Sequence, residues 1–113
     1  MEDVASLVLR VQAQETSPSE RIAAYSELVR RYQDMAAGYA FSNLGDFHLA
    51  EDAAQEAFLR AWEDLPGLQE PRAFATWFRR ILTSRCARLT RGRRIETADM
   101  EEAADIASNA PDP

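Results

Sequence analysis

The sequence predicts an all-α fold, a compact bundle of three or four helices, and three observations support this prediction. Apolar residues recur every three or four positions along most of the chain, which is the spacing of a helix with one buried face. No segment alternates apolar and polar residues as a half-buried strand does. Proline and glycine fall mainly between the periodic segments. At 113 residues, the chain can bury one modest core.

Residues typical of a helix N-terminus separate the first two expected helices. The first lies within residues 2–14 and is defined by four apolar residues at helical spacing, Val4, Leu7, Val8 and Val11. Ser17 is a suitable N-cap for the second, Pro18 fits its first position, and Glu20 completes a capping box. The periodic apolar residues of the second helix then continue to a break at residues 42–46: Ile22, Tyr25, Leu28, Val29, Tyr32, Met35, Ala36 and Tyr39.

Asp46 is a plausible cap for the third helix. Its expected buried side consists of Ala50, Ala54, Ala57, Phe58, Ala61, Trp62 and Leu65. Pro66 and Gly67 end this helix, and Pro71 is expected to be the first residue of the fourth. The apolar stripe of the fourth helix is Phe74, Trp77, Phe78, Ile81, Leu82 and Leu89. Gly92 is expected to stop it, and residues 95–113, acidic and rich in alanine, are expected to form a flexible linker or tail.

Charge is strongly sorted along the chain, whose net charge is −6. Residues 1–71 carry a net −8, residues 72–94 carry +8 with no acid among them, and residues 95–113 carry −6. A polyanion responds to the local field rather than to the average, so the acidic pI does not exclude nucleic acid as a partner. The basic segment is therefore the first candidate for a binding surface.

A helical wheel divides the arginines of the basic segment. Arg72, Arg79, Arg80 and Arg91 lie opposite the apolar stripe, and Arg88 lies at its edge. They are either an ordinary solvated face or a surface for a polyanion, and the absence of any acid to relieve their mutual repulsion favours the second interpretation. Arg85 falls within the stripe. Either the core ends near Leu82, or Arg85 pairs with a carboxylate of a neighbouring helix.

Two further groups of residues have both a structural and a functional interpretation. Phe74, Trp77 and Phe78 have the spacing of core residues, although a tryptophan beside arginines is also suited to stacking unpaired bases. The third helix carries an acidic ridge on the side away from its aromatic residues, Glu51, Asp52, Gln55 and Glu56. The ridge is either a solvated face or a docking surface for a basic partner.

Several classes of function lack support in the sequence. We interpret the single histidine, His48, and the single cysteine, Cys86, as structural, and no catalytic constellation, metal-ligand cluster or glycine-rich phosphate loop is present. We therefore expect no enzyme activity, no metal and no cofactor. No apolar run approaches the length of a membrane span, and the N-terminus does not resemble a signal peptide, so we expect a cytoplasmic protein.

Two strings at a fixed separation carry a resemblance to a known family. They are AEDAAQEAFLRAW and FATWFRRI, and they resemble region 2 of bacterial sigma factors of the extracytoplasmic-function (ECF) group. The resemblance runs from about residue 18 to residue 94, and it implies a helical region 2 domain over residues 1–94, followed by a linker or tail over residues 95–113. A complete member of the family continues into a second DNA-binding domain, which this sequence does not contain, so we expect it to be the first domain of a longer protein rather than a natural single-domain relative.

The resemblance implies a promoter-recognition subunit of RNA polymerase. Asp52, Gln55 and Glu56 match the positions that bind the clamp coiled coil of the largest catalytic subunit of core polymerase. The loop Pro66–Pro71 and the helix after it match the part that recognises and helps to melt the minus-ten promoter element, chiefly as the nontemplate single strand. The expected DNA-binding residues are those that match the family's DNA-binding positions and the arginines opposite or beside the apolar stripe: Arg72, Trp77, Arg79, Arg80, Ser84, Arg88 and Arg91.

The chain departs from the family pattern at three positions of the fourth helix. Ser84 replaces a common asparagine, Arg85 an aliphatic residue and Arg88 a common aspartate, which leaves the preferred promoter sequence open. The resemblance also implies regulation by an anti-sigma factor. Two other hypotheses are a helical protein-interaction module or adaptor that does not read DNA, and a peripheral membrane binder that uses residues 72–94 as a basic amphipathic helix.

Overall fold

The computed structural model describes the backbone of residues 1–100 and the side chains of residues 1–92, and this part of the chain contains helices and no strand. The all-α prediction is therefore confirmed. The elements, in order, are α1 (Val4–Gln12), α2 (Pro18–Leu44), α3 (Phe47–Asp64), the short 3₁₀ turns η1 (Leu65–Gly67) and η2 (Pro71–Ala73), and α4 (Phe74–Met100).

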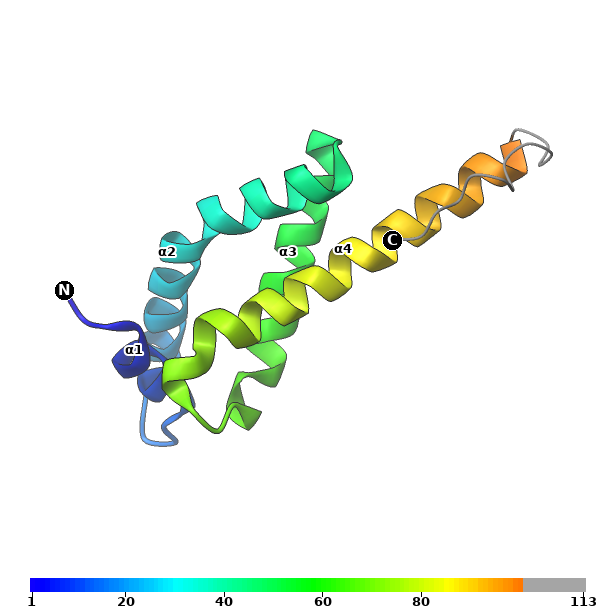
Figure 1. Ribbon diagram of the computed structural model, residues 1–113. Helices are drawn as coiled ribbons and strands as arrows, with labels where there is room; N and C mark the ends of the chain where they lie inside the picture. Colours follow the sequence, from blue (N-terminus) through cyan, green and yellow to red (C-terminus); the bar gives the residue numbers. More distant parts are fainter. Residues whose placement is uncertain (101–113) are drawn as a thin grey trace.

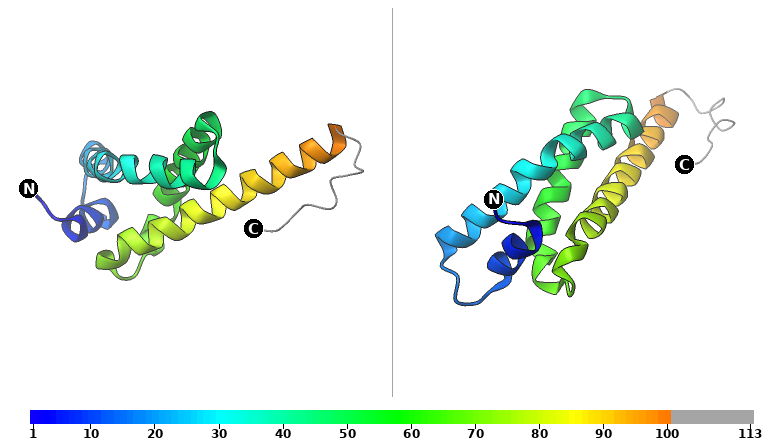
Figure 2. Two further views of the ribbon diagram at one scale, coloured as in Figure 1. Left: turned by 45° about the horizontal axis from the view of Figure 1, so that its top comes forward. Right: turned by 60° about the vertical axis from the view of Figure 1, so that its left-hand side comes forward.

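Three long helices form the bundle, and the short α1 closes one end of it. The chain reverses between α2 and α3, and α4 then packs against both of them (Figure 1). In both views of Figure 2, α1 lies beside the beginning of α4 and the turns that precede it. The last described turns of α4 extend beyond the α2–α3 pair (Figure 1). No helix in the described part is long and apolar enough to cross a membrane.

The core packs large side chains of α2 and α4 against α3, which contributes buried alanines and the partly buried Phe58. Phe74, Phe78 and Leu82 of α4 are fully buried, as is Leu28 of α2. The Phe58 ring lies 4.6 Å from the Phe78 ring, centroid to centroid. The buried residues of α3 itself are all alanines, Ala50, Ala53, Ala54, Ala57 and Ala61. Because alanine allows backbones to approach closely, α3 can contact α2 and α4 at the same time.

The predicted starts of α2 and α3 are confirmed at the atomic level. The Ser17 Oγ accepts a hydrogen bond from the Glu20 N–H at 3.2 Å, and the Ser17 N–H donates to the Glu20 carboxylate, so the capping box is complete. The Asp46 side chain accepts from the Leu49 N–H at 3.0 Å and starts α3. Gly45 ends α2 with a φ of 67°, the left-handed conformation that glycine adopts without a steric penalty.

The predicted stop at Gly92 is wrong, because α4 continues through it to Met100. A glycine in a helix interior weakens the helix by up to about 1 kcal/mol relative to alanine but does not end it. Glycine commonly ends an α-helix by adopting the left-handed conformation, which Gly45 alone adopts among the described glycines. Residues 95–100, expected to begin the tail, therefore continue α4, and the rest of the predicted tail lies outside the described residues.

Three further expectations need correction. Trp62 was expected on the buried side of α3, but it is 38% exposed, and Ile22 of the α2 stripe is 57% exposed. Both side chains lie along a groove between α2 and α3 that no other element of the described chain fills. Pro71 does occupy a first position, but it is that of η2, and α4 begins at Phe74.

Candidate functional site

The exposed side of η2 and α4 carries five arginines, which we call the arginine face: Arg72, Arg79, Arg80, Arg88 and Arg91. All five are exposed, as the helical wheel predicts. None of them forms an ion pair with an acid of the described chain. No acid of the described chain neutralises this charge by direct contact, although the Arg72 charge acts on Asp3 from beyond ion-pair distance, and the face can therefore attract a polyanion.

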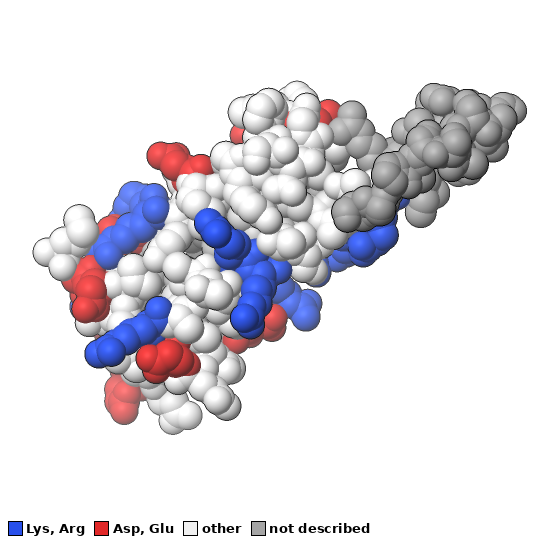
Figure 3. Space-filling view, in the orientation of Figure 1, with Lys and Arg blue, Asp and Glu red and all other residues white. Residues whose placement is uncertain are grey.

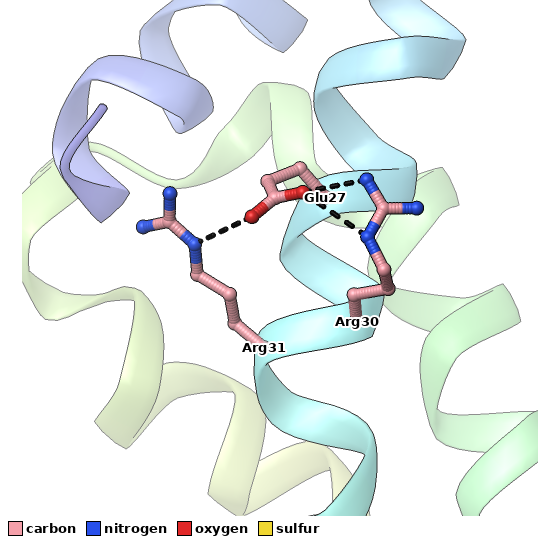
Figure 4. Close-up of polar contacts among 3 residues, drawn as sticks. All are labelled: Glu27, Arg30 and Arg31. Carbon is pink, nitrogen blue, oxygen red and sulfur yellow. Dashed lines mark hydrogen bonds and ion pairs between the residues drawn. The ribbon is translucent and has the colours of Figure 1, made fainter. Parts of the chain in front are cut away.

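Most arginines on the other helices are paired with a nearby acid, as two examples show. Glu27 lies between Arg30 and Arg31 on α2 and accepts hydrogen bonds from both (Figure 4), and the Glu27 pKa is lowered by these two bonds. Arg60 pairs with Asp64 at 2.9 Å on α3. Figure 3 shows basic side chains along the band of the surface where Figure 1 draws α4. Arg21 of α2 has no acidic partner in the described chain, but its guanidinium donates to the Val11 and Ala13 carbonyl oxygens, so the arginine face differs in gathering several exposed arginines without an ion pair.

The structure distinguishes between the two alternatives for Arg85. Cys86 is buried and Leu89 packs against the core, so the core does not end at Leu82. The Arg85 side chain is 21% exposed, and its Nη1 lies 4.0 Å from the Glu56 Oε1 of α3. The Arg85 Nε is buried and has no hydrogen-bond partner. Arg85 therefore pairs across the helix interface, and Glu56 faces α4 as well as the solvent.

A tyrosine that the sequence placed only in an apolar stripe contacts the arginine face. Thr83 Oγ1 donates its single hydrogen to the Arg79 carbonyl, so the Tyr39 hydroxyl must be the donor in its 3.0 Å bond to Thr83. The Arg79 guanidinium carbon lies 5.7 Å from the centroid of the Tyr39 ring, within cation–π range. Tyr39 thus fixes Arg79 from α2, and only the packing of α2 on α4 reveals this contact.

The other predicted DNA-binding residues lie in two places. Trp77 is half-buried against Phe74, with its ring centroid 5.8 Å away, while Ser84 is exposed two turns along α4. The loop Pro66–Pro71 connects the two 3₁₀ turns, and its Gln69 and Glu70 are exposed. Of the three aromatic residues, Phe74 and Phe78 are fully buried as core residues are, whereas Trp77 is only half-buried, so that one part of it packs and another part stays accessible.

The acidic ridge was expected on the side of α3 away from Phe58 and Trp62, but two of its members, Glu51 and Gln55, line the same groove between α2 and α3 as those two rings. Glu51, Asp52 and Gln55 are exposed, and Glu56 is half-exposed because of its position beside Arg85. Glu51 and Gln55 of α3 line the groove together with Asp34 of α2. The apolar residues that line it include Ile22, Tyr25, Val29, Phe58, Leu59 and Trp62. The ridge therefore combines negative charge with exposed apolar surface, which a solvated face alone does not require.

The remaining chemically reactive side chains do not form a site. Cys86 is buried, and burial raises the pKa of its thiol. His48 is exposed at the start of α3, where its ring contacts Phe47. Within residues whose side chains are described, no group of three or more His, Cys, Asp or Glu residues could hold a metal ion.

Comparison with known proteins identifies relatives of this chain. The family model for sigma-70 region 2 matches residues 28–96. The ECF RNA polymerase sigma factor SigW of Bacillus subtilis is 39% identical over 61 residues, which are 54% of this chain and 33% of SigW. The probable RNA polymerase sigma factor RfaY of Xanthomonas campestris is 37% identical over 84 residues, 74% of this chain and 21% of RfaY.

A third relative, the RNA polymerase sigma-H factor of Pseudomonas aeruginosa, is 35% identical over 79 residues, 68% of this chain and 41% of that protein. The chain thus spans less than half the length of each of these relatives. The comparison with solved structures finds no match. The region 2 match covers more than half of the chain and includes the acidic ridge, the loop and the arginine face. This chain therefore belongs to the sigma-70 region 2 family, as a domain of the ECF sigma factor type.

Proposed function

We propose that this chain is the promoter-recognition domain of a sigma factor, which binds core RNA polymerase and recognises and helps to melt the minus-ten promoter element. The observation that carries the proposal is the separation of two unlike surfaces on different helices. The arginine face is basic and unpaired, while the acidic ridge on α3 borders an apolar groove. In this role the chain acts in the cytoplasm and binds its partners without catalysing a reaction.

The acidic ridge and the groove are the proposed polymerase surface. Asp52, Gln55 and Glu56 are the positions at which the family binds the clamp coiled coil, and the exposed Asp52 and Gln55 are free to do so. A helix of such a coiled coil can lay apolar side chains into the groove while its basic side chains meet the ridge. The groove thus explains why Leu59 and Trp62 remain exposed in the free domain.

The arginine face and the loop Pro66–Pro71 are the proposed DNA surface. Arginines contact backbone phosphates and supply most of the affinity, whereas stacking on an aromatic ring favours unpaired bases. Trp77, Arg80, Ser84 and Arg88 follow one another at helical spacing, so that a strand lying along α4 can contact them in turn. An anti-sigma factor that covers either surface is the regulator we expect.

The deciding experiment measures the binding of the chain to purified bacterial core RNA polymerase, wild type beside Asp52→Arg. The reversal places a positive charge against a basic partner, so we expect at least about a tenfold loss of affinity. Glu15→Arg, an equal change of charge in the exposed connection between α1 and α2, is the matched control and should bind as the wild type does. Glu56→Arg is less decisive because it also breaks the pair with Arg85.

Two results would contradict the proposal. If the wild type fails to bind polymerase while its circular dichroism shows intact helices, the chain is instead an interaction module for another protein. If it binds polymerase but the complex takes up duplex and single-stranded DNA without regard to sequence, the promoter-recognition part of the proposal is wrong.

A further inference from the structure

Gln12, the last residue of α1, donates two hydrogen bonds to the segment that connects α3 to α4. Its Nε2 donates to the Leu65 carbonyl oxygen and to the Leu68 carbonyl oxygen, each at 2.9 Å. Both amide hydrogens of the side chain are thereby used, and both acceptors belong to the backbone. Gln12 lies outside residues 28–96, the part that matches the family model.

The two acceptors flank the first exposed part of the loop. The Leu68 N–H also donates to the Leu65 carbonyl at 3.0 Å and closes the turn η1. The Leu65 side chain is fully buried and that of Leu68 packs against the core, while Pro66 and Gly67 between them are exposed. Gln12 therefore fastens both ends of a turn whose middle faces the solvent, and no other described side chain bonds to these two carbonyls.

Gln12 is itself held in place from α2. The Arg21 Nε donates to the Val11 carbonyl at 2.9 Å, and an Arg21 Nη donates to the Ala13 carbonyl at 2.7 Å. The residues on either side of Gln12 are thus fixed by one guanidinium. Leu7, Val8 and Val11 are buried and dock α1 on the bundle. The amide of Gln12 is consequently presented to the loop by a rigid support rather than by a free terminus.

We propose that Gln12 is a positioning residue for promoter recognition, holding the turn at Leu65–Leu68 in the shape that accepts an unpaired base. The inference rests on the proposed function and deepens it, because it makes the selectivity of the loop depend on α1. A loop that is already ordered loses less conformational entropy on binding than a mobile one. Its hydrogen-bond donors and acceptors also keep fixed positions, so that they fit the bases of one DNA sequence better than those of others. Loss of the two bonds should therefore reduce discrimination between sequences more than it reduces overall affinity.

The test compares Gln12→Glu with Gln14→Glu in the full chain. Glutamate at position 12 has nearly the same shape but cannot donate, and its charge faces two carbonyl oxygens. Gln14 is exposed and has no hydrogen bond in the described chain, so its replacement is a matched change of charge two residues away. Gln12→Ala removes the donors without adding charge and separates the two causes.

Two quantities are measured for each variant. The first is the hydrogen-exchange rate of the Leu68 amide, which reports whether the turn opens. The second is sequence discrimination by the complex with core polymerase, given a pool of short single-stranded oligonucleotides with randomised central positions and read as the enrichment of the preferred sequence. We expect both Gln12 variants to exchange faster and to lose about five- to tenfold in enrichment, the amount expected from one poorly held base, with Gln14→Glu unchanged.

The outcomes separate this inference from the proposed function. Unchanged exchange in both Gln12 variants would show that the turn does not need Gln12. Faster exchange with unchanged enrichment would show that the turn does not set selectivity, and either result overturns the inference while leaving the promoter function intact. A wild-type complex that enriches no sequence overturns the promoter function itself. Overall loss of stability would lower the bound amount of every sequence alike and leave the enrichment unchanged.

Discussion

At the scale of single residues, Arg79 differs from the other members of the arginine face in being held from two sides. Its guanidinium lies against the Tyr39 ring, and its carbonyl accepts a bond from Thr83. The first contact uses the face of the Tyr39 ring, and the second uses the backbone oxygen of Arg79 itself. Neither occupies the N–H donors of the Arg79 guanidinium, which remain available to a phosphate. Side chains that are ordered before binding lose less entropy when they bind.

If Arg79 and Arg80 contact phosphates of a single strand, replacing both by alanine should weaken the salt dependence of DNA binding. Each phosphate neutralised contributes a slope of about −0.7 to log K against log salt, so we expect the slope to become shallower by about 1.4. The measurement is fluorescence anisotropy with the polymerase complex over a range of salt concentrations. The double variant Arg10→Ala, Arg30→Ala removes the same charge from arginines already paired with acids and should not alter the slope.

At the scale of elements, the attachment of α1 depends on a charged cap. The Asp3 carboxylate accepts a hydrogen bond from the Ser6 N–H at 2.8 Å. This bond is the largest cause that lowers the pKa of Asp3 below its ordinary value of 3.8, and the charges of Arg72 and Arg31 contribute less. Because α1 carries Gln12, the cap also supports the loop.

The lowered pKa of Asp3 fixes the direction of a pH effect. A carboxylate with a lower pKa in the folded state stabilises that state above its unfolded pKa, and the contribution is lost as the pH falls through the folded value. Asp3→Asn keeps an oxygen that can cap the helix but does not titrate. The melting temperature of the wild type should therefore exceed that of Asp3→Asn at neutral pH and approach it below pH 3.8. A constant difference over the acid range would contradict this assignment.

Two glycines allow a direct test of whether α2 ends at Gly45 and whether α4 continues through Gly92. Gly45 has a φ of 67°, whereas Gly92 lies within α4, and an added Cβ would meet no atom within 4 Å at either position. Gly92→Ala should therefore raise the helical content and the stability, by up to about 1 kcal/mol. Gly45→Ala should lower the stability by about 1 to 2 kcal/mol through backbone strain. Thermal unfolding followed at 222 nm measures both, and a loss of helix in Gly92→Ala would mean that α4 ends there.

At the scale of the whole molecule, the two proposed surfaces have opposite charge within a chain of net charge −6. The acidic remainder opposes the approach of DNA, so the isolated domain should bind DNA weakly, and binding to polymerase should strengthen it by covering part of the acidic ridge. The order of binding, polymerase first and promoter second, would follow from this distribution of charge.

The groove gives a test of the polymerase surface that does not depend on charge reversal. Leu59 borders the groove and is 67% exposed, while Leu9 on α1 lies outside it and is 55% exposed. Leu59→Asp should weaken binding to core polymerase by about tenfold or more, because it places a charge in an apolar contact. Leu9→Asp is the matched control and should bind as the wild type does. Equal binding by both variants would remove the groove from the interface.

Local signals in the sequence determined much of the fold and part of the candidate site. Ser17, Gly45 and Asp46 mark helix ends because caps act within three or four residues along the chain. The exposure of the arginine face also follows from the period of one helix. Gly92 shows where such a signal fails, since glycine permits the left-handed conformation but does not impose it.

The tertiary structure alone decided the contacts between residues distant in the sequence. Gln12 reaches a carbonyl 53 residues away, Tyr39 bonds to a threonine 44 residues away, and Arg85 finds Glu56 on another helix. The exposure of Trp62 likewise depends on the groove left between α2 and α3. Periodicity defines which side of a helix is apolar, but not which helix packs against it or where that packing ends. Those choices come from the shapes of all the side chains packed together, and they place the loop, the arginine face and the groove.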